Sequence, residues 1–266
     1  MTDRLGPAEL APHLRGTWRR VHCLEEVDST QRVARELAGA GAPEGTTVIA
    51  ERQTAGRGRL GREWHSPAGV NLYCSIVLRP PLPPGAAPQL ALVAGAAVAA
   101  AVAEETRLRP GIKWPNDVLL GGRKVAGILV ELDAEADRVR HAIAGIGVNL
   151  NAPETAFPPA LRATAGSLLL ATGRQVDRAA FTGRLLAALE ARYGRFLAKG
   201  FSSVRAEWES YSVLTGAQVR VVSSDGEIAG RVLGLDDDGA LRLGRPGGDV
   251  ARVVAGEVTL AGGDRT

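Results

Sequence analysis

Arginine and glycine alternate in one short segment, residues 56–62, which carries three arginines and three glycines. Glycine lets a backbone approach a ligand closely, and a guanidinium group makes paired, charge-assisted hydrogen bonds to phosphate or carboxylate oxygens. Arg57, Arg59 and Arg62 are therefore candidates for binding an anion, in a segment that we expect to order on its ligand. The alternative is a solvated basic surface loop, which is the commoner role of an isolated Gly-Arg run.

A second polar segment, Lys113-Trp114-Pro115-Asn116-Asp117, lies about fifty residues further on. Pro115 and Asn116 indicate a turn, and Gly121-Gly122 indicates a tight connection into an apolar strand that begins after Lys124. The polar groups thus stand at strand ends, where binding sites are often built. Two roles are open for Lys124, a site residue or an exposed hairpin lysine, and Asn116 and Asp117 could act through turn chemistry alone.

Four motifs in this order resemble the biotin protein ligases, also called biotin-[acetyl-CoA-carboxylase] ligases. The resemblance runs from about residue 20 to the C-terminus, and the Lys113–Asp117 motif is its most specific part. The motifs are Asp28-Ser29-Thr30, then Glu51-Arg52-Gln53 leading into the Gly-Arg segment, then Lys113–Asp117 with Lys124, and finally Gly147-Val148-Asn149.

The resemblance implies an ATP-dependent ligase that activates biotin as biotinyl-5'-AMP and transfers it to a lysine of a biotin carboxyl carrier protein. Because joining a carboxylate to the α-phosphate brings two anions together, the site needs fixed cations in a water-poor pocket. The expected catalytic residues are Lys124, Arg57 and Arg59, with Lys124 as an electrostatic stabiliser. Mg2+ adds charge on the phosphates, and Asp117 is a candidate to help place it.

The resemblance also assigns individual contacts. Uncharged polar side chains suit the fused urea ring of biotin, which offers donors and acceptors. The residues expected to bind biotin are Ser29, Thr30, Gln31, Gln53, Gly56, Arg57, Gly58, Arg59 and Lys124, and those expected to bind ATP are Arg59, Arg62, Trp64, Asn116 and Asn149.

Several of these residues have alternative roles. Asp28-Ser29-Thr30 also fits the N-cap of a helix, and both roles can hold together because a helix start leaves backbone N–H groups free. Gln31 stands where the family commonly has asparagine. The indole of Trp64 can stack on adenine or belong to the core. Asn149 can contact the nucleotide or end a strand.

Composition excludes several classes of protein. Of the 266 residues 45% are hydrophobic, which fits one sizeable core with a small extra domain. The longest apolar run, Leu90–Ala103, has 14 residues and predicts a core helix rather than a membrane span. Cys23 and Cys74 have no metal or redox spacing, and we expect no zinc site. With no apolar leader at the N-terminus, we expect a cytoplasmic protein.

Charge and chain length bear on the partners. The net charge of +3 permits nucleic-acid binding without arguing for it. Some biotin protein ligases carry an N-terminal helix-turn-helix, but only about 20 residues precede the first strand-like segment here. We therefore expect the form without the DNA-binding domain, binding neither DNA nor membrane, as a monomer or weak homodimer.

The pattern of elements predicts an α+β fold. Strands are expected near residues 21–27, 46–51, 70–79, 110–114, 118–120, 125–132 and 140–149, and helices near 29–40, 88–106 and 178–199. The resemblance implies a catalytic domain like that of class II aminoacyl-tRNA synthetases, over residues 1–213.

Short strands joined by glycine turns follow from about residue 214, and they predict a small SH3-like β-barrel over residues 214–266. The strands are expected at 218–223, 227–235, 241–243 and 251–260, with turns at Ser224-Asp225-Gly226, Asp237-Asp238-Gly239 and Pro246-Gly247-Gly248.

Two rival functions stay open. A lipoate protein ligase shares the reaction logic, but lipoate has no urea and would not need the polar set of Ser29, Thr30 and Gln53. A non-catalytic nucleic-acid binder with an SH3-like tail could use the Gly-Arg segment on phosphates. Biotin-dependent exchange of pyrophosphate into ATP distinguishes the biotin ligase from both.

Overall fold

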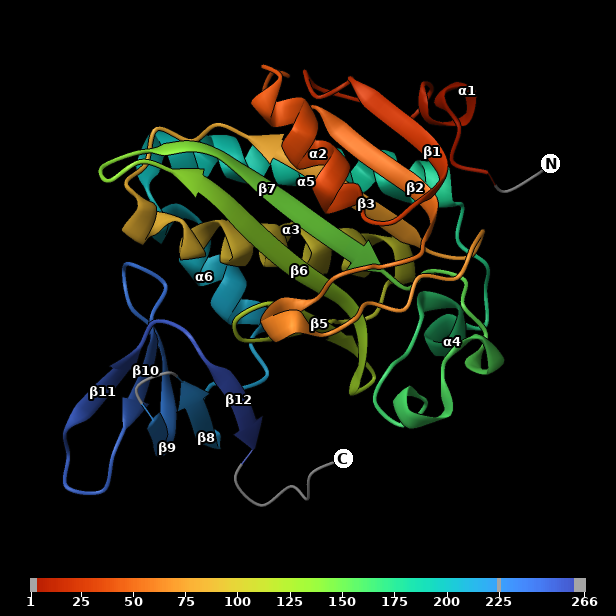
Figure 1. The fold of residues 1–266 in the computed structure, drawn as a ribbon. Helices are drawn as coiled ribbons and strands as arrows, with labels where there is room; N and C mark the ends of the chain where they lie inside the picture. Colours follow the sequence, from red (N-terminus) through yellow and green to blue (C-terminus); the bar gives the residue numbers. More distant parts are fainter. Residues whose placement is uncertain (1–3, 224–225, 261–266) are drawn as a thin grey trace.

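A seven-stranded sheet forms the larger part of the protein, in a computed structural model that describes residues 4–223 and 226–260 (Figure 1). The strand order is β1-β2-β3-β7-β6-β5-β4. Strands β1 and β2 run parallel and are joined by helix α2, whereas the other neighbouring pairs are antiparallel. The strands are β1 (Val21–Val27), β2 (Thr47–Gln53), β3 (Leu72–Leu78), β4 (Gly111–Lys113), β5 (Asp117–Leu120), β6 (Arg123–Ala134) and β7 (Val139–Val148).

Helices cover both faces of this sheet. Helix α2 (Thr30–Gly39) packs on β2, β3 and β7 from one side. On the other side lies α3 (Pro88–Thr106), which α5 (Arg178–Lys199) and α6 (Ser202–Tyr211) cover in turn. The shorter elements are α1 (Pro7–Leu10), α4 (Leu168–Thr172) and the 3-10 turns η1 (Arg59–Gly61), η2 (Pro84–Ala86), η3 (Glu154–Ala156) and η4 (Pro159–Leu161).

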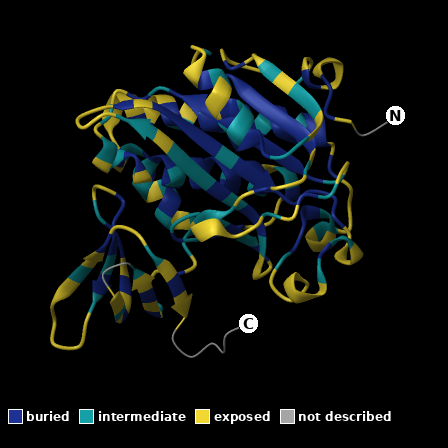
Figure 2. Cartoon of the chain, viewed as in Figure 1, coloured by how far each residue is buried: buried dark blue, intermediate teal, exposed yellow. Residues whose placement is uncertain are grey.

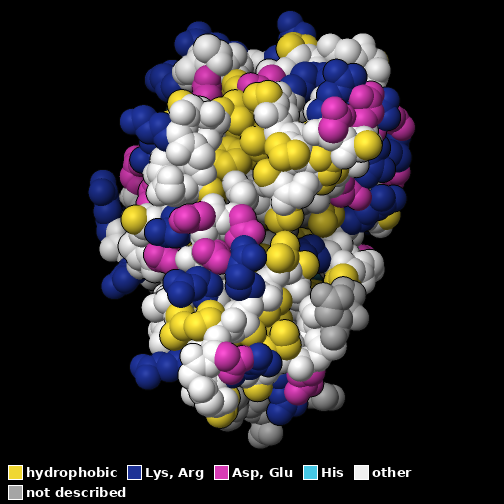
Figure 3. Space-filling model, turned by 90° about the vertical axis from the view of Figure 1, so that its left-hand side faces the viewer, with side chains coloured by type: hydrophobic (Ala, Val, Ile, Leu, Met, Phe, Trp, Pro, Cys, Tyr) yellow, Lys and Arg dark blue, Asp and Glu magenta, His cyan; other side chains and the backbone are white. Residues whose placement is uncertain are grey.

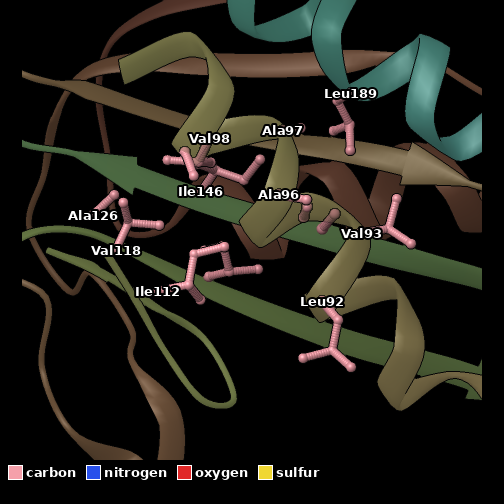
Figure 4. Close-up of a cluster of buried hydrophobic side chains, with 14 of the residues drawn as sticks. Leu92, Val93, Ala96, Ala97, Val98, Ile112, Val118, Ala126, Ile146 and Leu189 are labelled. Carbon is pink, nitrogen blue, oxygen red and sulfur yellow. The ribbon is translucent and has the colours of Figure 1, made fainter. Parts of the chain in front are cut away.

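Helix α3 is the centre of the core. Its alanine, valine and leucine side chains are buried almost all the way round, because the sheet lies on one side and α5 and α6 on the other. Figure 4 shows Val98 of α3 beside Ile146 of the sheet, and Leu189 of α5 on the other side of α3 from Ile112. Figure 2 shows the same buried interior in dark blue, beneath exposed outer segments.

The apolar character of α3 also meets the length and composition criteria for a membrane span, over Pro84–Thr106. In this protein, however, 67% of the apolar window is buried against other elements. The predicted core helix is therefore confirmed.

The C-terminal part is a five-stranded antiparallel sheet of order β11-β10-β9-β8-β12. Among the described residues β11 and β12 do not pair, so the predicted barrel is not closed. The expected single strand at 251–260 is two strands. The chain turns at residues 254–256, so that β11 pairs with β10 and β12 pairs with β8. The strands are β8 (Gln218–Ser223), β9 (Gly226–Leu235), β10 (Leu241–Gly244), β11 (Val250–Val253) and β12 (Glu257–Leu260); the turn expected at 224–226 falls partly outside the described residues.

Polar contacts fix this sheet against the larger part. The amide of Leu235 donates to the Glu209 carboxylate at the end of α6, at 2.8 Å. The buried indole Nε1 of Trp114 donates to the carbonyl of Gly239, at 3.3 Å. Trp114, which precedes a cis Pro115, thus packs between the two parts of the molecule.

Candidate active site

One cavity of about 50 Å³ collects most of the residues that the sequence singled out. It lies over β3, β6 and β7, between the start of α2 and the Gly-Arg segment. The expected residues that line it are Ser29, Thr30, Gln31, Gln53, Arg57, Gly58, Arg59, Trp64, Asn116 and Lys124. The others are Tyr73, Cys74, Ser75, Gly127, Ile128, Leu129, Gly145, Ile146 and Gly147.

Ser29 occupies the N-cap position of α2, as expected, but its hydroxyl makes no capping bond. Asp28 instead accepts from the Ser29 amide and pairs with Arg32 one turn later. These partners lower the pKa of the Asp28 carboxyl, with the Arg32 hydrogen bond as the main cause. The Ser29 Oγ is buried and has no partner among the described residues, so it is available to a ligand.

Thr30, Gln53 and Ser75 form a polar wall next to Ser29. The Gln53 Oε1 accepts from the Thr30 amide at 2.9 Å and from its hydroxyl at 3.0 Å. The Thr30 and Ser75 hydroxyls are 2.8 Å apart, and the Gln53 Nε2 donates to the hydroxyl of Ser66. The wall therefore joins α2, β2 and β3 through interlocking bonds that hold each side chain in place.

The side chain of Gln31 extends from the first turn of α2 to strand β6. Its Nε2 donates to the Glu131 carboxylate at 3.1 Å and to the Leu129 carbonyl at 3.3 Å. These bonds use the amide nitrogen, and they leave the Oε1 of Gln31 buried without a partner among the described residues. Gly145 makes room for the amide, since a Cβ there would stand 2.7 Å from the Gln31 Oε1.

The Gly-Arg segment forms a small hairpin. The Gly58 amide donates to the Arg62 carbonyl at 2.7 Å, and the Trp64 amide donates to the Gly56 carbonyl at 2.9 Å. Leu60 sits at the tip with a φ of 57° and is 73% exposed. The segment is thus held by its own backbone without an anion, and its further ordering on a ligand stays a prediction.

The arginines of the hairpin have different environments. Arg59 is half-buried and donates to the Asn116 Oδ1 at 2.9 Å. Burial lowers its pKa, and the nearby Asp117 carboxylate opposes that effect. Arg57 is exposed at the cavity and has no ion pair among the described residues. Arg62 points away from the cavity and pairs with Glu257 of the C-terminal sheet.

Trp64 lies on a platform of two glycines. A Cβ at Gly147 would stand 2.5 Å from the indole, and one at Gly127 would stand 2.9 Å from it. The Lys124 Nζ is 5.4 Å from the centroid of the Trp64 ring and 2.7 Å from the Asp117 Oδ1. Lys124 therefore meets the Gly-Arg hairpin across one shared cavity, as the proposed joining of two anions requires.

Four expected residues do not line the cavity. Besides Arg62, Gly56 packs behind the cavity against the Trp64 carbonyl, and Asp117 pairs with the lining residue Lys124 without lining the cavity itself. Asn149 is buried beside it, where its Nδ2 donates to the Gly166 carbonyl and its Oδ1 accepts from Asn71. In this structure both ends of the Asn149 amide therefore serve the strand-end role.

The charged side chains that line the cavity are all positive. Arg57, Arg59 and Lys124 line it, whereas the lining contains no acidic side chain. Across the described residues no group of three or more His, Cys, Asp or Glu side chains could hold a metal ion. The arrangement suits an anionic ligand that brings any metal ion with it.

Sequence reasoning missed much of the cavity floor. Tyr73, Cys74 and Ser75 of β3 were not singled out, whereas Gly147 of β7 belongs to the fourth motif and stands two residues after Gly145. Burial raises the pKa of the Cys74 thiol to about 12, so this thiol stays protonated. The alternate glycines of β7 fit the expectation that a ligand comes close to this strand, because two missing side chains on one face leave room for it.

Known proteins match both parts of the chain. The Biotin/lipoate A/B protein ligase family matches residues 23–149, and the biotin protein ligase C terminal domain matches residues 215–260. A biotin-[acetyl-CoA-carboxylase] ligase from Paracoccus denitrificans is 38% identical over 248 residues, which cover 90% of this chain and 100% of that protein. The chain belongs to the biotin protein ligase family.

Other members extend the match. The bifunctional ligase/repressor BirA of Bacillus subtilis is 44% identical over 217 residues, which cover 82% of this chain and 67% of BirA. The structure of a biotin protein ligase from Aquifex aeolicus in complex with biotin and ATP has a TM-score of 0.79 and 33% identity, covering 91% and 99% of the two chains. The expected family and its fold, with a C-terminal antiparallel sheet, are therefore confirmed.

Proposed function

We propose that this enzyme activates biotin with ATP to biotinyl-5'-AMP and then transfers biotin to a lysine of a biotin carboxyl carrier domain. The observation that carries the proposal is the cavity itself, where three cations from two distant segments meet uncharged polar groups. Complexes of a related ligase with biotin and ATP support the choice of substrates.

The polar end of the cavity favours biotin over lipoate. The Ser29 hydroxyl can donate to the carbonyl of the fused urea, and the Gln31 Oε1 can accept from one of its N–H groups. Both atoms are buried without partners among the described residues, which is costly unless a ligand supplies the missing bond. The dithiolane ring of lipoate offers neither group.

The cationic end serves the first half-reaction. A biotin carboxylate oxygen attacks the α-phosphorus of ATP, and pyrophosphate leaves. Arg57 and Lys124 offset the repulsion between carboxylate and phosphate, because charges fixed in a site that excludes water stabilise the transition state strongly. Arg59 and Asn116 hold each other at the phosphate side, and Trp64 offers an indole face to adenine.

Magnesium would enter with ATP. The lining contains no acidic side chain, so Mg2+ would be held mainly by phosphate oxygens, with Asp117 near enough to help only when Lys124 releases it. For Arg62 and Asn149 a role in ATP binding requires that they leave the partners they have in this structure.

The second half-reaction uses the same pocket. A lysine amine of the carrier domain attacks the acyl carbon, AMP leaves, and the amine gives up a proton. The Gly-Arg hairpin over the mixed anhydride would exclude water until the carrier arrives. Lys124 makes no covalent intermediate, because the acceptor amine belongs to the partner.

The remaining expectations form part of the same proposal. We place the domain boundary at 213/214 and relate the larger domain to class II aminoacyl-tRNA synthetases and the smaller to SH3-type folds. We also expect a cytoplasmic monomer or weak homodimer that binds neither DNA nor membrane. On the face in Figure 3, Lys and Arg side chains are interspersed with Asp and Glu, unlike the basic surface of many nucleic-acid binders.

Exchange of labelled pyrophosphate into ATP tests the proposal directly. We expect exchange that depends on biotin and that lipoate does not support. Exchange with lipoate alone would assign the other branch of the family. Absence of exchange with either acid, in protein that binds ATP, would contradict the proposal.

A further inference from the structure

The C-terminal sheet contacts the Gly-Arg hairpin at two points. The Glu257 carboxylate pairs with the Arg62 guanidinium, and the Gly256 carbonyl lies 3.5 Å from both terminal nitrogens of Arg59. We call these four residues the interdomain clasp. Its members are about 200 positions apart in the sequence, yet adjacent residues of one turn meet two arginines of one hairpin.

The turn that carries Gly256 and Glu257 has a fixed position. A Cβ at Gly256 would stand 2.8 Å from the Val221 Cγ1 and 2.8 Å from the Val222 carbonyl oxygen, so the turn lies directly on β8. Glu257 then pairs in register with Val222 at the start of β12. Because Glu209 and Trp114 anchor the C-terminal sheet to the larger domain, the clasp has a fixed position relative to the cavity.

The hairpin needs such a support on its outer side. Beyond the backbone bonds of the hairpin, Leu60 at its tip is largely exposed, and the positive charges of Arg59 and Arg62 disfavour each other. The Glu257 carboxylate offsets the charge of Arg62 outside the cavity. Arg57, which has no ion pair among the described residues, stays available inside it.

We infer that Glu257 is a positioning residue, which holds the Gly-Arg hairpin over the cavity for nucleotide binding and adenylate retention. The effect on ATP rests on the proposed function, whereas the effect on the hairpin does not. Glu257 touches no reacting atom, so its removal should leave the biotin end of the cavity unchanged.

Glu257→Gln tests the clasp, and Glu227→Gln is the matched control. Glu227 pairs with Arg220 within the same sheet and does not touch the hairpin. In the ligand-free protein we expect trypsin to cleave after Arg57, Arg59 and Arg62 several times faster in Glu257→Gln than in wild type or control. This measurement needs no substrate, so it stands even if the proposed activity fails.

Kinetics then separate positioning from general structure. We expect Glu257→Gln to raise the KM for ATP about two- to fivefold, the range that an exposed ion pair supports, and to raise the KM for biotin less, because the polar end of the cavity at Ser29 and Gln31 is not part of the hairpin. Biotinyl-5'-AMP should also escape faster from the variant. Unchanged cleavage would overturn the inference, and so would a lower KM for ATP, because Glu257 would then compete with phosphate for Arg62.

Discussion

Ser29 stands at the N-cap position of α2, but its hydroxyl accepts no hydrogen bond from the first turn of the helix. Asp28 binds Arg32 and the Ser29 amide, and Ser29 itself makes no capping bond. A serine placed at a helix start therefore remains free for a ligand. The residue types predicted the cap and the resemblance to the family implied the ligand contact, but only the structure shows that the side chain has no partner among the described residues.

Ser29→Ala separates binding from capping. The urea oxygen of biotin would lose a donor, so we expect the KM for biotin to rise about 5- to 150-fold, the equivalent of 1–3 kcal/mol for an unsatisfied polar group. The free energy of unfolding of the ligand-free protein should not fall, since no capping bond is lost and a buried hydroxyl without a partner among the described residues is removed. Kinetics with biotin and urea denaturation measure the two quantities.

Asp177→Ala is the control for a working cap. The Asp177 carboxylate accepts from the Ala180 amide at the start of α5, at 2.9 Å. Its loss should cost about 1 kcal/mol of stability and leave the KM for biotin unchanged. Equal destabilisation in both variants would show that Ser29 caps its helix after all.

At the level of elements, the site is formed by the start of α2 and by residues of β3, β6 and β7. The predicted strands and helices of the larger domain are all present, with ends shifted by at most two residues. Helix α6 was missed because its short amphipathic pattern follows Gly200 directly after α5. Alternation and apolar runs mark elements well, but they do not show which strands become neighbours, so the floor of β3, β6 and β7 could not be assembled from sequence.

The glycine platform under Trp64 gives a test at this scale. Gly147→Ala would push the indole away, since a Cβ would stand 2.5 Å from it. We expect the KM for ATP to rise about 2- to 12-fold, the equivalent of 0.5–1.5 kcal/mol of aromatic contact, if Trp64 stacks on adenine. The intrinsic fluorescence of the ligand-free protein should also shift.

Gly194→Ala serves as the comparison, because nothing lies within 4 Å of a Cβ at this position of α5. The added methyl should stabilise the helix by roughly 0.5–1 kcal/mol without changing the KM for ATP. Thermal unfolding measures the first effect. An unchanged KM for ATP in Gly147→Ala as well would argue against an adenine contact of Trp64.

At the scale of the whole molecule, the site depends on contacts between segments far apart in the chain. The Gly-Arg hairpin meets Lys124 across the cavity, and the C-terminal sheet supports the hairpin from outside. Charge and glycine content made the hairpin a candidate anion site, and the Lys113–Asp117 motif favoured that role over a solvated basic loop. The partners of Arg59 and Arg62 in the C-terminal turn were not predictable, because nothing in Gly256 or Glu257 marks the surface that they face.

The joint action of cations from two segments is the central claim, and a double-mutant cycle measures it. Biotin-dependent pyrophosphate exchange would be compared in wild type, Arg57→Gln, Lys124→Gln and the double variant. Each single change should lower kcat by about 10²–10³-fold, the usual loss for one fixed electrostatic contact. Because both side chains act on one pair of anions, the double variant should lose far less than the product of the single losses. A loss equal to that product, or full activity in Lys124→Gln, would contradict the account.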